Sequence, residues 1–410
     1  MIRFILILFL FLFVPTVVFA QTGEGAFNNK GNYLDTNFRN ILIIKEKVHF
    51  GGIINNYMSF ENYPKRKMSF TNEFYLGVKT RGNKNWHKQY KFPEIGASLI
   101  LGNLGNPNEL GNVFGIVPNM NIEISRNNKS IFRTIIGIGA GYFNKPFDSI
   151  SNPYNILIGS HFTNLSFFSL AWDYKLSQNM QLVASANIFH ASNGHYQIPN
   201  AGMNMPTLNF GIKYYMNNNY EKVDEIANNL YKKKNIFKLN FMFGAGMHEF
   251  ANTIAPVGTP KWKIYSGTLF ASYRKNNIYK YFTGFSAKYY SSFYDFITRT
   301  KYYDNNIHLK STVFTFVGGH EFLFGHFGLS TQMGYNFYTP LTVKRFKANN
   351  HVEKISFDKA IEIYTSFDMG LKYYLYETNY WTKSNLFLGI TIKTNFFKAD
   401  FIELSMGFVI

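Results

Sequence analysis

A histidine and a serine separated by a single residue stand near the middle of the chain, at His190 and Ser192. A serine hydroxyl is a poor nucleophile until a neighbouring base takes its proton, and an imidazole is a suitable base. We expect Asn204 in the following loop, where its amide oxygen can accept a hydrogen bond from the other ring nitrogen. These residue types predict attack on an acyl ester. The alternative is a pair of rim residues without chemistry.

Amide groups follow this pair directly. The Asn193 side chain and the backbone N–H of Gly194 can donate hydrogen bonds to an oxyanion, which an ester carbonyl becomes during attack. The following stretch, 199–202, contains a proline, an asparagine and a glycine, and it is equally typical of a simple turn.

The segment 181–192 has the alternation of a β-strand. Its apolar residues occupy every second position, and Ser185 and Asn187 stand between them. Because successive side chains of a strand point to opposite faces, His190 and Ser192 share the apolar face. Their Cβ atoms are then roughly 6.5–7 Å apart, within reach of a hydrogen bond between the side chains.

The first twenty residues are typical of a secretory signal peptide. A positive charge at Arg3 precedes an apolar run that ends at Ala20, where we predict cleavage. An N-terminal membrane anchor is the alternative, although the run is shorter than the ~20 residues that a spanning helix needs. The chain has no cysteine, which excludes disulfides, thiolate metal sites and a lipid anchor on cysteine. We predict no metal and no cofactor.

The composition favours a β-barrel of the bacterial outer membrane. Aromatic residues make up 19% of the chain and charged residues 16%, and short alternating segments continue almost to the last residue. A soluble, secreted all-β protein is the alternative. The net charge of +18 suits an anionic surface such as lipid A phosphates, but a lysine-rich proteome explains it equally well. We expect no nucleic-acid partner.

The alternating segments fall into two sets of eight. We predict strands over 48–58, 68–80, 92–102, 113–126, 131–143, 156–176, 179–192 and 205–216, and then over 236–249, 261–274, 278–292, 309–322, 325–338, 360–375, 385–395 and 401–410. Between the sets, 217–235 is polar with apolar residues at helical spacing, which predicts a short periplasmic helix. The predicted domains are a signal peptide 1–20, a barrel half 21–216, the linker 217–235 and a barrel half 236–410.

Two architectures use the same strands. Two eight-stranded, antiparallel, up-and-down barrels joined by the linker are favoured, and one barrel of about sixteen strands is the alternative. If both ends of the first half lie in the periplasm, its seventh strand runs outward. His190 and Ser192 then lie at the outer rim on the lipid-contacting face, where the substrate is a lipid of the outer leaflet.

A family resemblance supports this interpretation. The run His190-Ala191-Ser192-Asn193-Gly194, followed by Pro199-Asn200 and Gly202, resembles the signature of the lipid A 3-O-deacylases, the PagL family. The chain also resembles the longer exported proteins called acyloxyacyl hydrolases in Bacteroidetes-type bacteria. The supporting stretches are Trp86-His87, Tyr90 to Gly96, Leu110 to Val113, Asn152 to Asn155 and Lys393 to Glu403. The resemblance to the longer proteins covers nearly the whole mature chain, and that to the deacylases covers about 40–217.

The resemblance implies an eight-stranded barrel that removes an ester-linked acyl chain from lipid A. It makes His190 the base and Ser192 the nucleophile, with Asn193 and Asn200 as polar supports of the oxyanion region. One position departs from the family, because Asn204 stands where the deacylases have glutamate. An asparagine can orient a histidine but cannot stabilise imidazolium with charge.

The predicted function is therefore an outer-membrane serine esterase acting on lipid A of lipopolysaccharide. A non-catalytic barrel with a structural, adhesive or transport role is one alternative, and a phospholipase using the same two residues is another. The second half lacks the site, because the matching strand carries Leu388, Ile390 and Ile392 on the corresponding face. We expect the His-Glu pairs at 248–249 and 320–321 to be rim or lumen residues, since adjacent strand residues face opposite ways.

Overall fold

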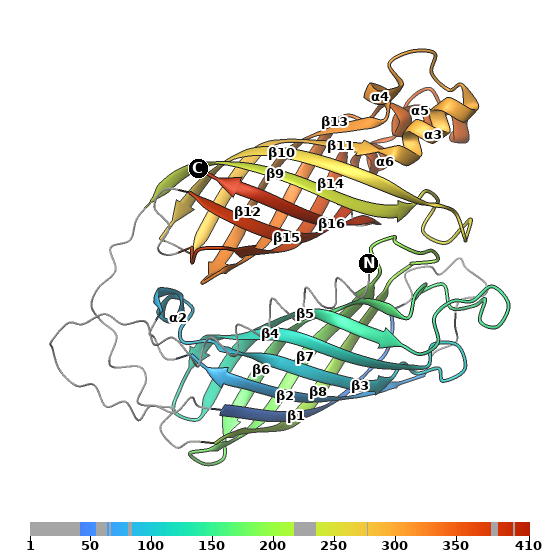
Figure 1. Ribbon diagram of the computed structural model, residues 1–410. Helices are drawn as coiled ribbons and strands as arrows, with labels where there is room; N and C mark the ends of the chain where they lie inside the picture. The colour runs from blue at the N-terminus through green and yellow to red at the C-terminus, as the bar shows by residue number, and fades with distance from the viewer. Residues whose placement is uncertain are drawn as a thin grey trace. The chain divides into compact units, whose positions relative to one another are not determined.

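The computed structural model describes residues 42–54, 64, 67–80, 84–216, 235–276, 278–378, 384–396 and 398–410 (Figure 1). The chain divides into two compact units, each built around one closed barrel. The predicted signal peptide 1–20 lies outside the described residues, as does all of the predicted linker except Asn235. The domain boundaries drawn from these segments stay predictions.

The first barrel is a closed ring of antiparallel neighbours. The pairing of β8 with β1 closes it, with Phe50 opposite Leu208. Its strands are β1 (Leu42–Gly51), β2 (Ser69–Lys79), β3 (Glu94–Asn103), β4 (Asn112–Arg126), β5 (Ser130–Phe143), β6 (Phe162–Lys175), β7 (Met180–Ser192) and β8 (Met203–Tyr215).

The second barrel repeats this plan and is closed by the pairing of β16 with β9. Its strands are β9 (Ile236–Glu249), β10 (Lys261–Lys275), β11 (Tyr279–Tyr290), β12 (Thr312–Phe324), β13 (Phe327–Tyr338), β14 (Thr365–Tyr374), β15 (Asn385–Asn395) and β16 (Lys398–Val409). The prediction of two eight-stranded barrels is confirmed. The single large barrel is excluded, because each set of strands closes on itself.

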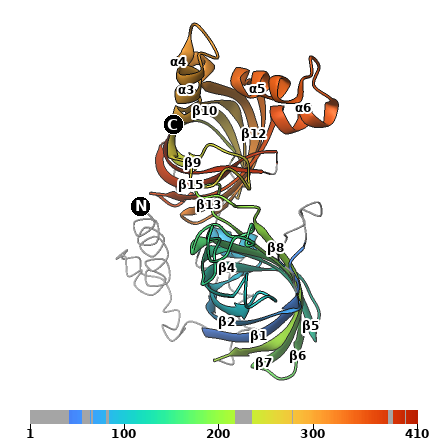
Figure 2. The same ribbon diagram turned by 90° about the vertical axis from the view of Figure 1, so that its right-hand side faces the viewer.

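Helices interrupt the second barrel at places where the sequence predicted none. They are α3 (Ser291–Thr300), α4 (Ile307–Lys310), α5 (Pro340–Asn350) and α6 (Phe357–Tyr364). In both views they gather at one end of the barrel (Figures 1 and 2). The predicted strand 360–375 was wrong at its start, because 360–364 belong to α6, which has Asp358 in its first turn where the helix dipole favours an acid. A fifth helix, α2 (Asn85–Gln89), lies between β2 and β3. None of the described helices is long and apolar enough to cross a bilayer.

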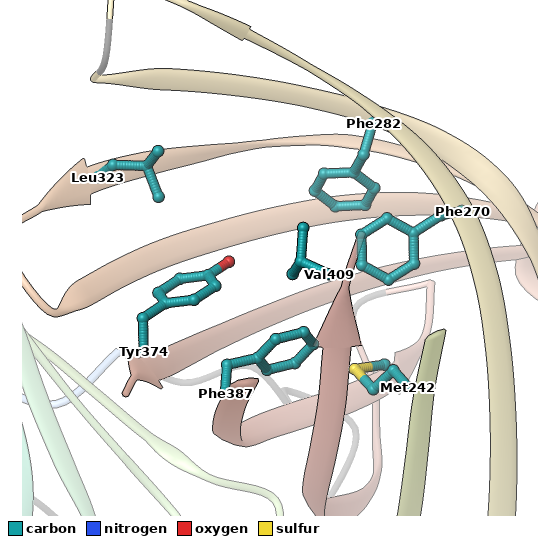
Figure 3. Close-up of a cluster of buried hydrophobic side chains, with 7 residues drawn as sticks. All are labelled: Met242, Phe270, Phe282, Leu323, Tyr374, Phe387 and Val409. Atoms are coloured by element: carbon teal, nitrogen blue, oxygen red, sulfur yellow. The ribbon is translucent and has the colours of Figure 1, made fainter. Parts of the chain in front are cut away.

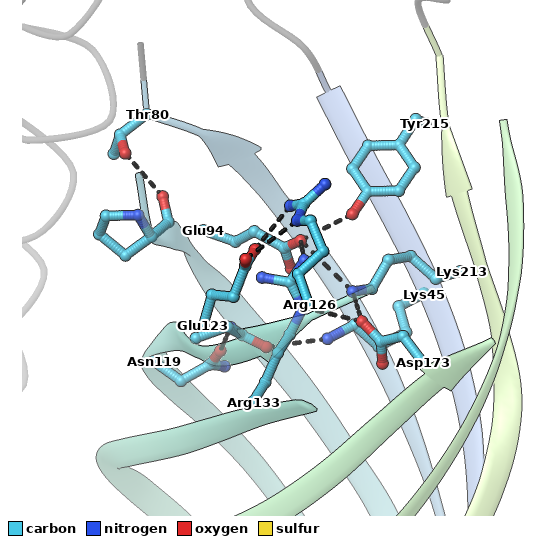
Figure 4. A network of polar contacts seen from close by, with 12 residues as sticks. Lys45, Thr80, Glu94, Asn119, Glu123, Arg126, Arg133, Asp173, Lys213 and Tyr215 are labelled. Atoms are coloured by element: carbon cyan, nitrogen blue, oxygen red, sulfur yellow. Dashed lines mark hydrogen bonds and ion pairs between the residues drawn. The ribbon is translucent and has the colours of Figure 1, made fainter. Parts of the chain in front are cut away.

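The first barrel is apolar outside and charged inside. In β5, Phe132 is exposed while Arg133 is buried. Arg133 lies 2.8 Å from Asp173 and 3.2 Å from Glu94, and Lys213 also contacts both carboxylates (Figure 4). Such ion pairs satisfy charges that would be unstable alone in the interior of a narrow barrel. In β5 an apolar side chain thus faces outward while its charged neighbour faces the lumen.

The second barrel has a mixed interior. Seven buried apolar or aromatic side chains form a cluster (Figure 3): Met242, Phe270, Phe282, Leu323, Tyr374, Phe387 and Val409. Beside them, Glu321 accepts hydrogen bonds from Lys372 at 3.0 Å and from the Tyr374 hydroxyl at 2.6 Å. Side chains thus pack the lumen of this barrel as well.

The two ends of the first barrel have different connections. At the end of the barrel where β7 finishes, the strands are joined by long loops: 104–111, 144–161 and 193–202. At the other end, 127–129 and 176–179 are tight turns, and 80–93 carries α2. Outer-membrane barrels have short periplasmic turns and longer extracellular loops. The end of β7 thus carries the longer connections, the pattern of an extracellular end.

Candidate functional site

The two central residues of the candidate site lie at the end of β7 on its outer face. Exposure alternates along this strand, and Leu182, Ala186 and Ile188 are on the exposed side while Val183 and Asn187 are buried. His190 continues the exposed series and is half-buried. Ser192 is the last residue of the strand, and it is only 5% exposed. The parity that the sequence predicted for His190 is therefore observed.

Asn204 contacts the imidazole of His190 directly. The two residues are register partners across β7 and β8, and His190 Nδ1 lies 2.8 Å from Asn204 Oδ1. With the amide oxygen toward the ring, Nδ1 carries the proton and donates it, which leaves Nε2 as the basic nitrogen. The sequence analysis placed Asn204 in a loop. That placement was wrong, because β8 begins at Met203 and positions Asn204 by ladder pairing.

Two polar residues of β6 stand opposite the pair, and the sequence analysis did not single them out. Asn164 is the register partner of Ser192, and Ser166 is that of His190. The Asn164 amide donates to the Gly139 carbonyl at 3.1 Å, whereas its buried Oδ1 has no hydrogen-bond partner among the described residues. The sequence signal for these two residues was the presence of polar side chains at two outward positions of a strand face that is otherwise apolar.

Hydrogen bonds within the following loop order its asparagines. The backbone N–H of Asn193 donates to Asn200 Oδ1 at 3.1 Å, and the Asn193 side-chain amide donates to the Gln197 carbonyl at 2.7 Å. Gly194 has φ +63° and Gly202 has φ +78°, conformations that favour glycine. Asn200 thus holds the loop that directly follows Ser192, a role nearer to support than to direct catalysis.

Large apolar side chains lie beside the site on the outer surface. Ile188 precedes His190 by two residues, and Phe168 is its register partner on β6. Leu208 on β8 is 60% exposed. An apolar surface of this kind contacts hydrocarbon in a membrane barrel. The polar residues of the site therefore stand where the apolar belt meets the extracellular rim.

The second barrel carries no His-x-Ser run in its sequence. On β15, Leu388 is exposed and Ile390 and Ile392 are half-buried, whereas Phe387 is buried. On β12, His320 is half-buried and Glu321 is fully buried, so the two face opposite ways. His248, at the end of β9, is buried beside residues that the sequence analysis did not connect with it.

Solved structures similar to this chain include a porin and OprD. A BenF-like porin from Pseudomonas fluorescens Pf-5 is 9% identical, with 90% of this chain and 97% of that chain covered and a TM-score of 0.22. OprD of Pseudomonas aeruginosa is 9% identical, with 90% and 94% covered and a TM-score of 0.20. These scores are too low to support an argument about function.

Comparisons of sequence are more specific. No curated protein matches the chain. The model of one family, described as lipid A 3-O-deacylase (PagL), matches residues 73–213. This range runs from β2 to β8. It includes the six site residues that the sequence predicted: His190, Ser192, Asn193, Gly194, Asn200 and Asn204. Residues 73–213 of the first barrel therefore resemble the lipid A 3-O-deacylase family.

Proposed function

We propose that the first barrel is an outer-membrane serine esterase that removes an ester-linked acyl chain from lipid A of lipopolysaccharide. The observation that carries the proposal is the contact of 2.8 Å between His190 Nδ1 and Asn204 Oδ1 on the outer face, two residues before Ser192. It lies within the region that matches the deacylase family.

The proposed reaction follows from the roles of these side chains. His190 Nε2 takes the proton of the Ser192 hydroxyl as the oxygen attacks the ester carbonyl. The same proton then passes to the leaving alkoxide, and water hydrolyses the acyl-enzyme in a second, equivalent cycle. Asn204 keeps the ring in the productive tautomer, and the loop from Asn193 to Asn200 supports the oxyanion region.

The position of the site favours a lipid of the outer leaflet as substrate. His190 lies on the outer surface, beside the exposed Ile188 and at the end of the barrel with the long loops. A soluble solute in the lumen would meet the opposite face of β7, where Asn187 and Ser185 are buried. An acyl chain can instead lie against the apolar exterior while its ester reaches the rim.

The test is mass spectrometry of lipid A from a Gram-negative host that expresses either the wild type or Ser192→Ala. We expect lipid A lighter by one hydroxyacyl chain with the wild type only, because loss of the nucleophile lowers the rate by at least about a thousandfold. Ser185→Ala is the matched control, since this serine lies on the same strand but faces the lumen.

Both variants are first shown to be folded, by the heat-dependent gel mobility that is typical of such barrels. Identical lipid A spectra from folded wild type and Ser192→Ala would refute the proposal. Fatty acid released from phospholipid in the same membranes, with lipid A unchanged, would assign the site to a phospholipase instead.

A further inference from the structure

A second serine lies beside a histidine in the second barrel, within a buried group of polar residues. His248 Nε2 is 3.0 Å from the Ser292 hydroxyl oxygen, and His248 Nδ1 is 3.4 Å from Asp400 Oδ1. The Tyr290 hydroxyl donates to the other oxygen of Asp400 at 2.6 Å. One ring nitrogen therefore faces a hydroxyl and the other faces a carboxylate, as in a Ser-His-Asp triad.

Three different elements bring these residues together at the end of the barrel that carries the helices. His248 is the penultimate residue of β9, and Ser292 is the second residue of α3, which follows β11 directly. Asp400 lies in β16 next to a register shift at Lys393 and Thr394. A bulge of this kind re-aims side chains, and both Asp400 and the adjacent Phe401 are buried.

The local backbone suits an activated serine. Ser292 stands where a strand turns into a helix, and the first N–H groups of a helix have no partner within the helix. The positive end of the helix dipole favours negative charge there, including an oxyanion. We propose that Ser292, His248 and Asp400 form a second serine hydrolase site, distinct from that of the first barrel.

Aromatic side chains cover this group. The ring centroid of Phe250 lies 5.5 Å from that of Phe293 and 6.0 Å from that of Phe296. The guanidinium of Arg345, from α5, lies 4.6 Å from the Phe250 ring and 4.9 Å from the Phe296 ring. Ser292 is 1% exposed, and the Phe250 ring centroid lies 6.3 Å from that of His248, so a substrate reaches the serine only when the side chains around it move. The apolar cover fits an ester with a short apolar acyl chain.

The reaction balances with water as the co-reactant. The Ser292 oxygen bonds to the carbonyl carbon while its proton moves to His248 Nε2. The carbon–oxygen bond of the ester then breaks, and the alkoxide takes that proton and leaves as the alcohol. Water, deprotonated by His248, attacks the acyl-enzyme and releases the carboxylic acid and Ser292. Asp400 holds the ring and stabilises the imidazolium.

The experiment uses the full-length protein folded in detergent and carrying Ser192→Ala, so that the first barrel does not contribute. A fluorophosphonate probe is added, and the modified serine is located by peptide mass spectrometry. We expect an adduct on Ser292, with labelling slowed about a hundredfold or more by His248→Gln because the base is lost. Hydrolysis of 4-nitrophenyl butyrate should fall in parallel.

Two further variants make the test specific. Ser291→Ala is the matched control, because this neighbouring hydroxyl donates to the Lys263 carbonyl at 2.7 Å, and labelling of Ser292 should stay unchanged. Phe250→Ala removes part of the cover and should speed labelling roughly tenfold, because the ring contacts of Phe250 with Phe293 and Phe296 are lost.

The absence of an adduct on Ser292 in folded protein, including the Phe250→Ala variant, would overturn the proposal. An adduct whose rate is indifferent to both His248→Gln and Asp400→Asn would overturn it as well. The mapped position of the adduct separates this outcome from any result at Ser192.

Discussion

The two barrels share a strand plan, but His190 of the first barrel and His248 of the second lie on opposite faces. In the first barrel, His190 and Asn204 meet on the outer surface, next to exposed apolar side chains. In the second, His248 meets Ser292 and Asp400 in a buried group under aromatic rings. Each histidine lies within two residues of the end of its strand, so the face on which it stands decides whether it meets the membrane or the interior of the barrel.

This difference shows that the face of the strand on which a residue lies determines which kind of substrate can reach it. A residue pair on the outer face can be reached by a lipid within the bilayer, with no opening of the barrel. A group under the α3–α6 end is reached from the aqueous side, and only after its cover moves. The connections differ as well, since among the described residues four helices lie between the strands of the second barrel and one, α2, lies between strands of the first.

The largest expected effect comes from removing the outward histidine. His190→Gln should lower deacylation of lipid A by about 10²–10⁴-fold, because the general base is lost. The matched control is His320→Gln, an outward histidine of the second barrel with Phe322 where His190 has Ser192. Lipid A mass spectrometry measures both. Equal losses of deacylation in His190→Gln and His320→Gln would contradict the assignment of the activity to the first barrel.

The charged lumen should matter to stability and not to chemistry. Glu94→Gln removes the carboxylate that Arg133 and Lys213 share, and breaking a buried ion pair destabilises a fold by about 3–5 kcal/mol. Glu321→Gln is the counterpart in the second barrel, beside Lys280 and Lys372. Urea unfolding followed by tryptophan fluorescence should show a lower midpoint in each case. Unchanged midpoints would mean that the networks do not hold the barrels.

A smaller effect is expected at the residue that departs from the family pattern. Asn204→Ala removes one hydrogen bond to His190, worth about 1 kcal/mol, and should reduce deacylation roughly fivefold. Asn204→Glu should instead raise the rate, because a carboxylate also stabilises imidazolium. A pH–rate profile separates the two variants, since a carboxylate introduced beside the general base moves the ascending, acidic limb of the profile to higher pH. A profile that is identical in all three proteins would exclude a positioning role.

The smallest effect is expected at the helical end of the second barrel. Glu362 of α6 contacts Lys398 and lies 2.9 Å from Lys359, and these lysines hold the pKa of its carboxyl below the ordinary value of 4.5. A carboxyl whose pKa is lowered on folding stabilises the folded state at every pH above its pKa in the unfolded chain. That stabilisation is lost as the pH falls through the lowered pKa of the folded state. Glu362→Gln should therefore lower stability by less than about 1 kcal/mol at pH 7, and by less at pH 3. A constant difference at both values would contradict this.

Much of the fold was predictable because alternation is a local signal. The strand 236–249 was predicted with its observed bounds, and β7 and β10 differ from the prediction by one residue at one end. The position of His190 on the exposed face followed from the same parity. The helices α3 and α5 were missed because they span only 10 and 11 residues, too few for a clear helical period between the predicted strands.

The second polar group could not be predicted, because its members are far apart in the chain. Ser292 follows His248 by 44 residues in the sequence. Asp400 comes beside them only because β16 pairs with β9 and closes the barrel. Asn164 was overlooked for a related reason, since its importance depends on the register between β6 and β7. Register is set by pairing and not by the pattern of one strand.

The charged interior of the first barrel has a consequence for export. With Glu94, Arg133 and Lys213 at alternate-face positions, no strand is a continuous apolar stretch, and the mean hydropathy of the chain is −0.15. Continuous apolar stretches are what a translocation channel releases sideways into the cytoplasmic membrane. The residues that fill the finished lumen thus let the unfolded polypeptide pass through that membrane and acquire its apolar exterior only on closure.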